Sequence, residues 1–329
     1  MVALIQYLPV FALVILANLK SRATQFAAYL ILILVNVTLL FASVFYFLAH
    51  WMTRQPSLPE SYATLVRFLS LWRINLAQMG LTLLLTALVS SAFLLLPLRK
   101  LLAHWLPIDP HSLLDCTALA LTAYYVGLTL AQLMLLGGLD TLARGVIAPA
   151  PLDLLVGGAC LVILAALGVG WGTRRSLREV LKRLKLEGMS RQQWLLAAGL
   201  IVSFLVLDYA MAVIWSRLAP DSYAAVSKAM AGLFGDLTSP QKALAIALSA
   251  GIGEETLFRG ALQPRFGIWF TSLAFALGHL QYGLSPALVE VFIISVVLGY
   301  VRQRYNMTTC IVVHAVYNFA DLALSFLFP

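Results

Sequence analysis

Apolar runs of about twenty residues recur along the whole chain and restrict the folds open to it. A helix of that length crosses a hydrocarbon core of about 30 Å. Hydrophobic residues make up 61% of the sequence and charged residues only 11%, against about 25% charged residues in ordinary soluble domains. The sequence therefore predicts a polytopic membrane protein, an all-α bundle of transmembrane helices.

The apolar runs predict ten spans, within a range of eight to ten. They lie at residues 2–18, 26–48, 79–97, 113–137, 153–172, 193–215, 241–264, 267–282, 286–301 and 308–327. The first run has no basic segment before it and no small-residue cleavage signal, so we interpret it as a retained helix. Three cysteines, Cys116, Cys160 and Cys310, lie inside apolar runs, and we expect buried thiols there instead of disulfides or a metal site.

The net charge of +8 is concentrated between two predicted spans, in residues 174–191. Leucine and valine recur there at near-helical spacing, which predicts an amphipathic helix on the inner membrane face and not a nucleic-acid site. With this segment in the cytoplasm and the spans alternating, fourteen Lys and Arg residues fall inside and seven outside. This bias predicts that both termini face outward. Segments 50–72 and 217–240 are predicted to lie along the outer interface.

Ionisable residues inside a membrane are costly, so each one suggests a functional role. After residue 240 they occur in three motifs, "EETLFR", "FALGH" and "HAVYN". Glu255 and Arg259 are four residues apart with the acid first, the favourable order for an ion pair on one helix face. Glu254 is rotated from Glu255 by about 100°. We therefore expect Arg259 to neutralise Glu255 and Glu254 to face a site.

The other two motifs supply polar groups from separate helices. His314 and Asn318 are four residues apart, so one helix presents both to the same space. Phe275 lies one turn before His279 and is expected to pack beside it. Measured from the expected helix ends, Glu254, His279 and His314 lie at similar depths, roughly 9–18 Å into the membrane. The sequence therefore predicts a site formed by a carboxylate and two imidazoles from three helices.

The order Glu-Glu-x-x-x-Arg, Phe-x-x-x-His, His-x-x-x-Asn resembles the CPBP family of intramembrane proteases. That family includes the type II CAAX prenyl endopeptidases and many bacterial proteins described as bacteriocin-immunity or Abi proteins. The resemblance covers residues 193–329. It implies an intramembrane protease domain there, and we expect residues 1–192 to form an accessory transmembrane region of about five spans that ends in the basic segment.

The resemblance also implies roles for the motif residues. Glu254 and His279 would activate a water molecule that attacks a peptide carbonyl, while His314 and Asn318 would donate hydrogen bonds to the developing oxyanion. Glu255, Arg259 and Phe275 would support the site. No covalent nucleophile and no cofactor is implied.

By the same resemblance, the substrate is a membrane-associated or lipid-anchored protein or peptide, and nucleic acid is not a partner. We expect a bacterial inner membrane with the site opening toward the cytoplasm. Residues 1–192 are available to form a homo-oligomer or to bind a partner.

Three alternatives remain open. Glu254, His279 and His314 could ligate zinc, because histidine and carboxylate ligands with an open position are typical of catalytic zinc sites. The chain could be a non-catalytic immunity or partner-binding protein. A proton-coupled transporter would use further intramembrane carboxylates such as Asp208 and Glu290, but the inverted repeats expected of transporters are not evident, and we interpret these two as interhelical or interfacial residues.

Overall fold

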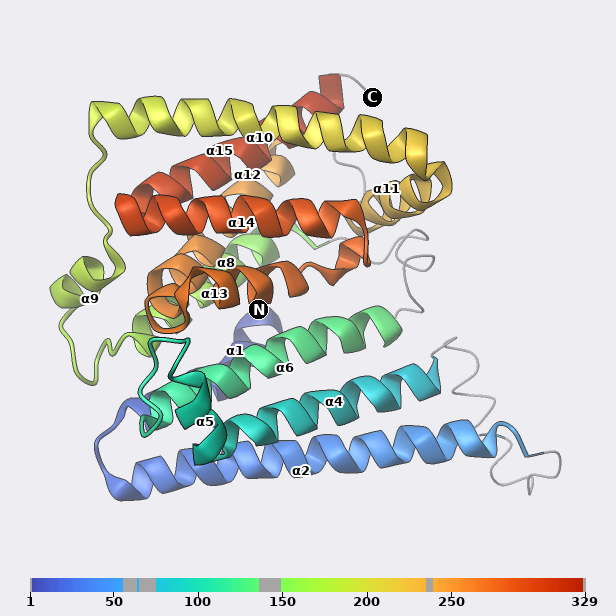
Figure 1. Ribbon diagram of the computed structural model, residues 1–329, viewed down its shortest axis with the longest axis vertical. Helices are drawn as coiled ribbons and strands as arrows, with labels where there is room; N and C mark the ends of the chain where they lie inside the picture. Colours follow the sequence, from blue (N-terminus) through green and yellow to red (C-terminus); the bar gives the residue numbers. More distant parts are fainter. Residues whose placement is uncertain (1, 56–63, 65–74, 136–148, 235–238, 328–329) are drawn as a thin grey trace.

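The computed structural model describes residues 2–55, 64, 75–135, 149–234 and 239–327, and these form a bundle of helices (Figure 1). The described residues contain no β-strand. The long helices are α1 (Val2–Asn18), α2 (Arg22–Met52), α4 (Leu76–Leu94), α6 (Leu113–Leu135), α8 (Pro151–Gly168), α10 (Arg191–Leu218), α13 (Gln263–Leu277), α14 (Pro286–Arg304) and α15 (Met307–Leu327). The shorter ones are α5 (Leu96–Leu102), α9 (Leu177–Leu184), α11 (Pro220–Phe234) and α12 (Pro240–Leu248).

Seven helices of the described part are long and apolar enough to cross a membrane: α2, α4, α6, α8, α10, α14 and α15. Large apolar side chains such as Phe26, Phe41 and Trp269 are exposed on the bundle surface, as expected where a helix faces lipid. The predicted all-α, polytopic bundle is confirmed, and the chain is an integral membrane protein. The predicted span at 241–264 is helical but irregular. In the one at 267–282, α13 ends at Leu277 and a 3-10 helix follows at Leu280–Tyr282.

The predicted amphipathic helix at 174–191 is shorter than expected. Helix α9 ends at Leu184, because Lys185 adopts a left-handed conformation (φ 54°), and α10 begins at Arg191. The residues between them hydrogen-bond to the turn before α15, with Asn306 Nδ2 donating to the carbonyl of Gly188 at 3.1 Å. Segment 217–240 contains α11. Most of segment 50–72 lies outside the described residues.

One end of the bundle collects the positive charge. Figure 1 shows α5, α9, the connection from α1 to α2 and the connection from α14 to α15 at the same end, on the left of the view. We call this the basic end. It carries the residues predicted to face the cytoplasm: Lys20, Arg22, Arg99, Lys100, Arg174, Arg175, Arg178, Lys182, Arg183, Lys185, Arg191, Arg265, Arg302 and Arg304.

Helix α8 joins the N-terminal helices to the C-terminal part at a close crossing of backbones. It packs against α1, α12 and the π-helix η1 (Ser249–Glu254). A Cβ added at Gly253 would lie 2.8 Å from the Cα of Gly158, and one added at Gly158 would lie 2.9 Å from the Cα of Ser249. Small residues permit such approaches between membrane helices. The backbone directly before Glu254 is thus fixed by a helix of the N-terminal region.

We expect Gly158→Ala to destabilise the protein by about 1–3 kcal/mol, because the new methyl group would overlap the backbone of η1. Gly157→Ala is the matched control, since a Cβ at Gly157 meets nothing within 4 Å. The midpoint of thermal unfolding in detergent should fall for the first variant and stay near wild type for the second. Equal midpoints for the two variants would contradict the close crossing.

Candidate active site

The first motif lies in a helix of unusual geometry. After α12 the chain continues as η1 and then as a second π-helix, η2 (Thr256–Leu262), with Glu255 between them. π-Helical turns are rare and occur often at functional sites, because they change the direction in which side chains project. A periodicity of 3.6 residues per turn does not predict them. Glu254, the last residue of η1, and Glu255 therefore project from a part of the helix that is wound more widely than an α-helix.

Glu255 is the centre of a buried charged network. Its Oε1 lies 3.1 Å from Arg259 Nη1 and 2.7 Å from His314 Nδ1. The Glu255 side chain is 0% exposed and that of Arg259 is 1% exposed. The predicted Glu255–Arg259 pair is therefore present. The contact between Glu255 and His314 was not predicted, since we expected His314 to face Glu254.

Arg259 has further partners on two neighbouring helices. Its Nη2 donates to the hydroxyl of Ser295 on α14 at 3.0 Å. Its guanidinium lies over the ring of Phe275 on α13, with Cζ 4.3 Å from the ring centroid. The network thus connects the π-helical segment with α13, α14 and α15. Phe275 packs beside His279, as the sequence predicted, and also contacts Arg259. The ring centroids of Phe275 and His279 lie 4.6 Å apart.

Glu254 is oriented differently and faces His279. Its Oε2 lies 4.0 Å from His279 Nε2, with side chains 24% and 17% exposed. This oxygen is buried and has no hydrogen-bond partner among the described residues. His279 Nδ1 lies 2.8 Å from the carbonyl oxygen of Phe275, and because a carbonyl can only accept, Nδ1 carries the proton. In the neutral imidazole, Nε2 is then an acceptor directed toward Glu254.

Two acceptors at 4.0 Å cannot bond to each other directly. A molecule that donates two hydrogens can lie between them, and water is the smallest that does so. The arrangement of Glu254 and His279 is therefore suited to hold and deprotonate a water molecule. Asn318 lies one turn beyond His314 on α15 and is partly buried.

The structure adds residues near the site that no sequence motif indicated. The hydroxyl of Tyr125, on α6, contacts the position just before His279, where a Cβ on Gly278 would lie 2.0 Å from it. The ring of Tyr125 also lies 5.8 Å from that of Phe258. Tyr282 stacks on His279 with centroids 6.3 Å apart. Among these residues, only Gly278 of "FALGH" offered a sequence indication of the contact, because a glycine permits the close approach of α6.

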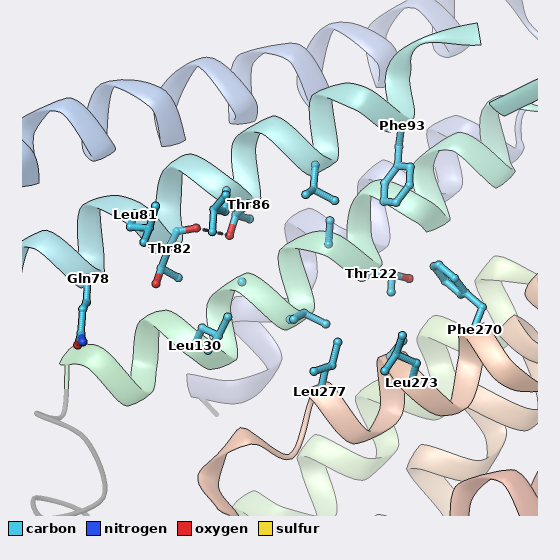
Figure 2. Close-up of a pocket in the computed structure, with 16 residues that line it drawn as sticks. Gln78, Leu81, Thr82, Thr86, Phe93, Thr122, Leu130, Phe270, Leu273 and Leu277 are labelled. Carbon is cyan, nitrogen blue, oxygen red and sulfur yellow. Dashed lines mark hydrogen bonds between the residues drawn. The ribbon is translucent and has the colours of Figure 1, made fainter. Parts of the chain in front are cut away.

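An apolar pocket of about 410 Å³ lies between α4, α6 and α13 (Figure 2). Leu81, Leu130, Phe270 and Leu277 are among the side chains that line it. Leu277 is the last residue of α13, two positions before His279. The lining of the pocket thus includes the end of α13, while Glu254 and His279 are not part of it.

The geometry can be compared with the zinc alternative. The described residues contain no group of three or more His, Cys, Asp or Glu side chains arranged to hold a metal ion. In particular, His314 is in contact with Glu255 through Nδ1, while His279 faces Glu254 through Nε2.

Residues 237–320 match the family model described as type II CAAX prenyl endopeptidase Rce1-like. The chain carries an Rce1-like domain. The matched range includes all three motifs, so the resemblance drawn from them is confirmed, while residues 1–236 lie outside the match. No curated protein and no solved structure matches the chain.

The Rce1-like family indicates a protease of the CAAX type. The roles of individual residues, and the division of the chain at residue 192, stay predictions. The contacts of α8 with η1 and of Tyr125 with Gly278 cross that division. The Rce1-like domain is therefore packed directly against the N-terminal helices.

Stability measurements can separate the two adjacent glutamates. Glu255→Ala would leave Arg259 buried without its carboxylate, a change that typically costs about 3–5 kcal/mol. Glu254→Ala removes a partly exposed side chain with an unbonded oxygen and should leave stability nearly unchanged. We expect a large fall in the unfolding midpoint in detergent for the first variant only. The reverse order would show that the two carboxylates have been assigned the wrong positions.

Proposed function

We propose that the chain is an intramembrane endopeptidase in which Glu254 activates water without a covalent intermediate. The observation that carries this proposal is the unbonded Glu254 Oε2, 4.0 Å from His279 Nε2, inside the Rce1-like domain. Glu254 would remove a proton from water while the water oxygen attacks the carbonyl carbon of the peptide bond. Glu254 would then return the proton to the leaving amine, so that the carboxylate is regenerated.

His279 would position the water in this scheme. Its Nδ1 hydrogen bond to the carbonyl of Phe275 favours the tautomer in which Nε2 accepts. The rings of Phe275 and Tyr282 pack against the imidazole and limit its rotation. Water held between His279 and Glu254 would have one hydrogen directed to each.

His314 and Asn318 would stabilise the oxyanion. Because Glu255 is an acceptor when ionised, His314 Nδ1 donates to it, and Nε2 can donate to an oxyanion only when the imidazole is protonated. Glu255, Arg259 and a protonated His314 together carry one net positive charge. The negative charge that develops on the carbonyl oxygen would neutralise this positive charge. Fixed hydrogen-bond donors are most effective when they are directed at such a developing charge.

We propose a membrane-associated or lipid-anchored protein or peptide as substrate. The apolar pocket between α4, α6 and α13, which is lined by Leu277 two positions before His279, supports a substrate with an apolar membrane-embedded part (Figure 2). We further propose a bacterial inner membrane, with the site opening toward the basic end and the cytoplasm. The collection of Lys and Arg residues at that end supports this orientation.

Glu254→Gln is expected to lower cleavage by about 10²-fold or more, because an amide cannot act as the base. Membranes from cells that express wild type or variant can be compared by mass spectrometry for new peptide termini. Glu290→Gln is the matched control, because Glu290 is also a buried intramembrane glutamate but lies on α14 outside the site. The new peptide termini found with Glu290→Gln should match those found with wild type.

Three outcomes would contradict this proposal. Equal cleavage by Glu254→Gln and wild type would exclude Glu254 as the base. The absence of any new termini with wild type would favour the non-catalytic, partner-binding alternative. Cleavage should persist in the presence of a chelator, whereas loss that zinc restores would favour the zinc alternative.

Asn318→Ala should lower kcat by about 10²–10³-fold with a much smaller change in KM, because the lost donor acts on the oxyanion and not on the bound substrate. The measurement uses a peptide reporter built around a cleavage site found by terminus mapping. A rise in KM with unchanged kcat would instead assign Asn318 to substrate binding.

A further inference from the structure

A groove at the basic end is lined by side chains that the proposed peptidase reaction does not use. It has a volume of about 630 Å³ and lies between α9, the start of α13 and the end of α14. We call it the basic groove. Its lining residues are Arg175, Glu179, Lys182, Arg183, Lys185, Pro264 and Arg302.

The basic groove contains five cations and one acid, and the acid is already bonded. Both Ser176 N and Ser176 Oγ donate to Glu179 Oε2 at 2.8 Å. These hydrogen bonds lower the pKa of Glu179, so the carboxylate is ionised and committed to the start of α9. With Glu179 counted, the lining side chains have a net charge of four positive units.

The cations of the groove lie close enough to affect one another. Burial, followed by the charges of Arg265, Arg175 and Arg302, lowers the pKa of Arg183. None of the five lining cations forms an ion pair with a carboxylate within the part of the chain that the structure describes. Lys185 Nζ donates instead to the carbonyl of Tyr305 at 3.3 Å. The groove is therefore a concentration of uncompensated positive charge.

Arg302 is a buried cation of the groove with an unsatisfied hydrogen-bond donor. The residue is 5% exposed, it lines the groove, and its Nε has no hydrogen-bond partner among the described residues. A buried donor without an acceptor is costly, and a charged one more so. The other cations of the groove offer no acceptor, and Arg302 forms no ion pair with a carboxylate among the described residues. An anion with several oxygen acceptors would satisfy this side chain.

A second pocket, of about 520 Å³, adjoins the groove and shares Lys185, Pro264 and Arg302 with it. Trp269 and Tyr300 also line this pocket and are exposed. Tryptophan and tyrosine are typical of the headgroup level of a membrane. The exposed leucines of α9, Leu177 and Leu181, are suited to the same depth. The groove therefore lies where lipid phosphates are found, beside a surface suited to acyl chains.

We propose that the basic groove binds the phosphate headgroup of an anionic membrane phospholipid. The Arg302 guanidinium would donate to the phosphate oxygens from inside the groove, and Lys182 and Arg183 would bind it from α9. The glycerol and acyl chains would lie along Trp269 and Tyr300. This site is independent of the proposed peptidase reaction and is expected to persist in Glu254→Gln.

The test is native mass spectrometry of the full-length protein in detergent, titrated with phosphatidylglycerol. Wild type should retain one molecule of this lipid in preference to phosphatidylcholine. Arg183→Gln and Lys182→Gln should each weaken binding about fivefold, the equivalent of about 1 kcal/mol per basic residue at a membrane surface. Arg178→Gln is the matched control: it makes the same charge change on the same helix, but Arg178 is exposed and does not line the groove.

Arg302→Lys tests the geometry separately, since it keeps the charge and removes the guanidinium, and it should also weaken binding. If this variant fails to fold, the comparison of Arg183→Gln with Arg178→Gln decides. Equal weakening by those two would overturn the proposal, because it would indicate general attraction to the basic end. Displacement of the lipid by inorganic phosphate at similar concentration would also overturn it, in favour of a site for free phosphate.

Discussion

The buried carboxylate of Glu255 is the interaction on which the site depends. One oxygen of this side chain receives both Arg259 Nη1 and His314 Nδ1, and Arg259 continues to Ser295. A single charge therefore fixes the relative positions of the π-helical segment, α14 and α15. A buried pair of this kind gives little net stability compared with an apolar contact, but breaking it is expensive. The shared carboxylate thus connects these helices, while Glu255 Oε2 and Arg259 Nη1 have no hydrogen-bond partner among the described residues.

The N-terminal helices take part in the construction of the site although they contain none of its motifs. Gly158 of α8 contacts the backbone at Gly253, and Tyr125 of α6 contacts the backbone at Gly278. Each contact falls on the residue directly before a motif residue, Glu254 in one case and His279 in the other. A shift of α6 or α8 would therefore move one of the two groups that face each other at 4.0 Å. The accessory region and the Rce1-like domain are mechanically linked at these two points.

Local sequence was sufficient to predict most of the long apolar helices and the Glu255–Arg259 pair, because both depend on residues within one helix. It could not predict the π-helices, which depend on how α12 and its continuation pack against α8 and α15. The bond from His314 to Glu255 joins residues far apart in sequence, and rotation about two helix axes decides whether it forms. The same holds for Tyr125, since nothing in residues 1–192 distinguishes this tyrosine from others. These contacts depend on tertiary packing between helices, and local sequence patterns do not predict such packing.

Helix α14 connects the candidate site with the basic groove. Ser295, Gly299 and Arg302 are spaced four and then three residues apart, so they share one face of the helix. Ser295 accepts from Arg259, and the carbonyl of Gly299 accepts from Gln263 Nε2 at 2.8 Å. Arg302, at the end of this face, lines the groove. Because both contacts are buried, α14 cannot slide along its axis without breaking them together. One face of α14 therefore carries the contact with Arg259 near its middle and the Arg302 side chain of the basic groove at its end.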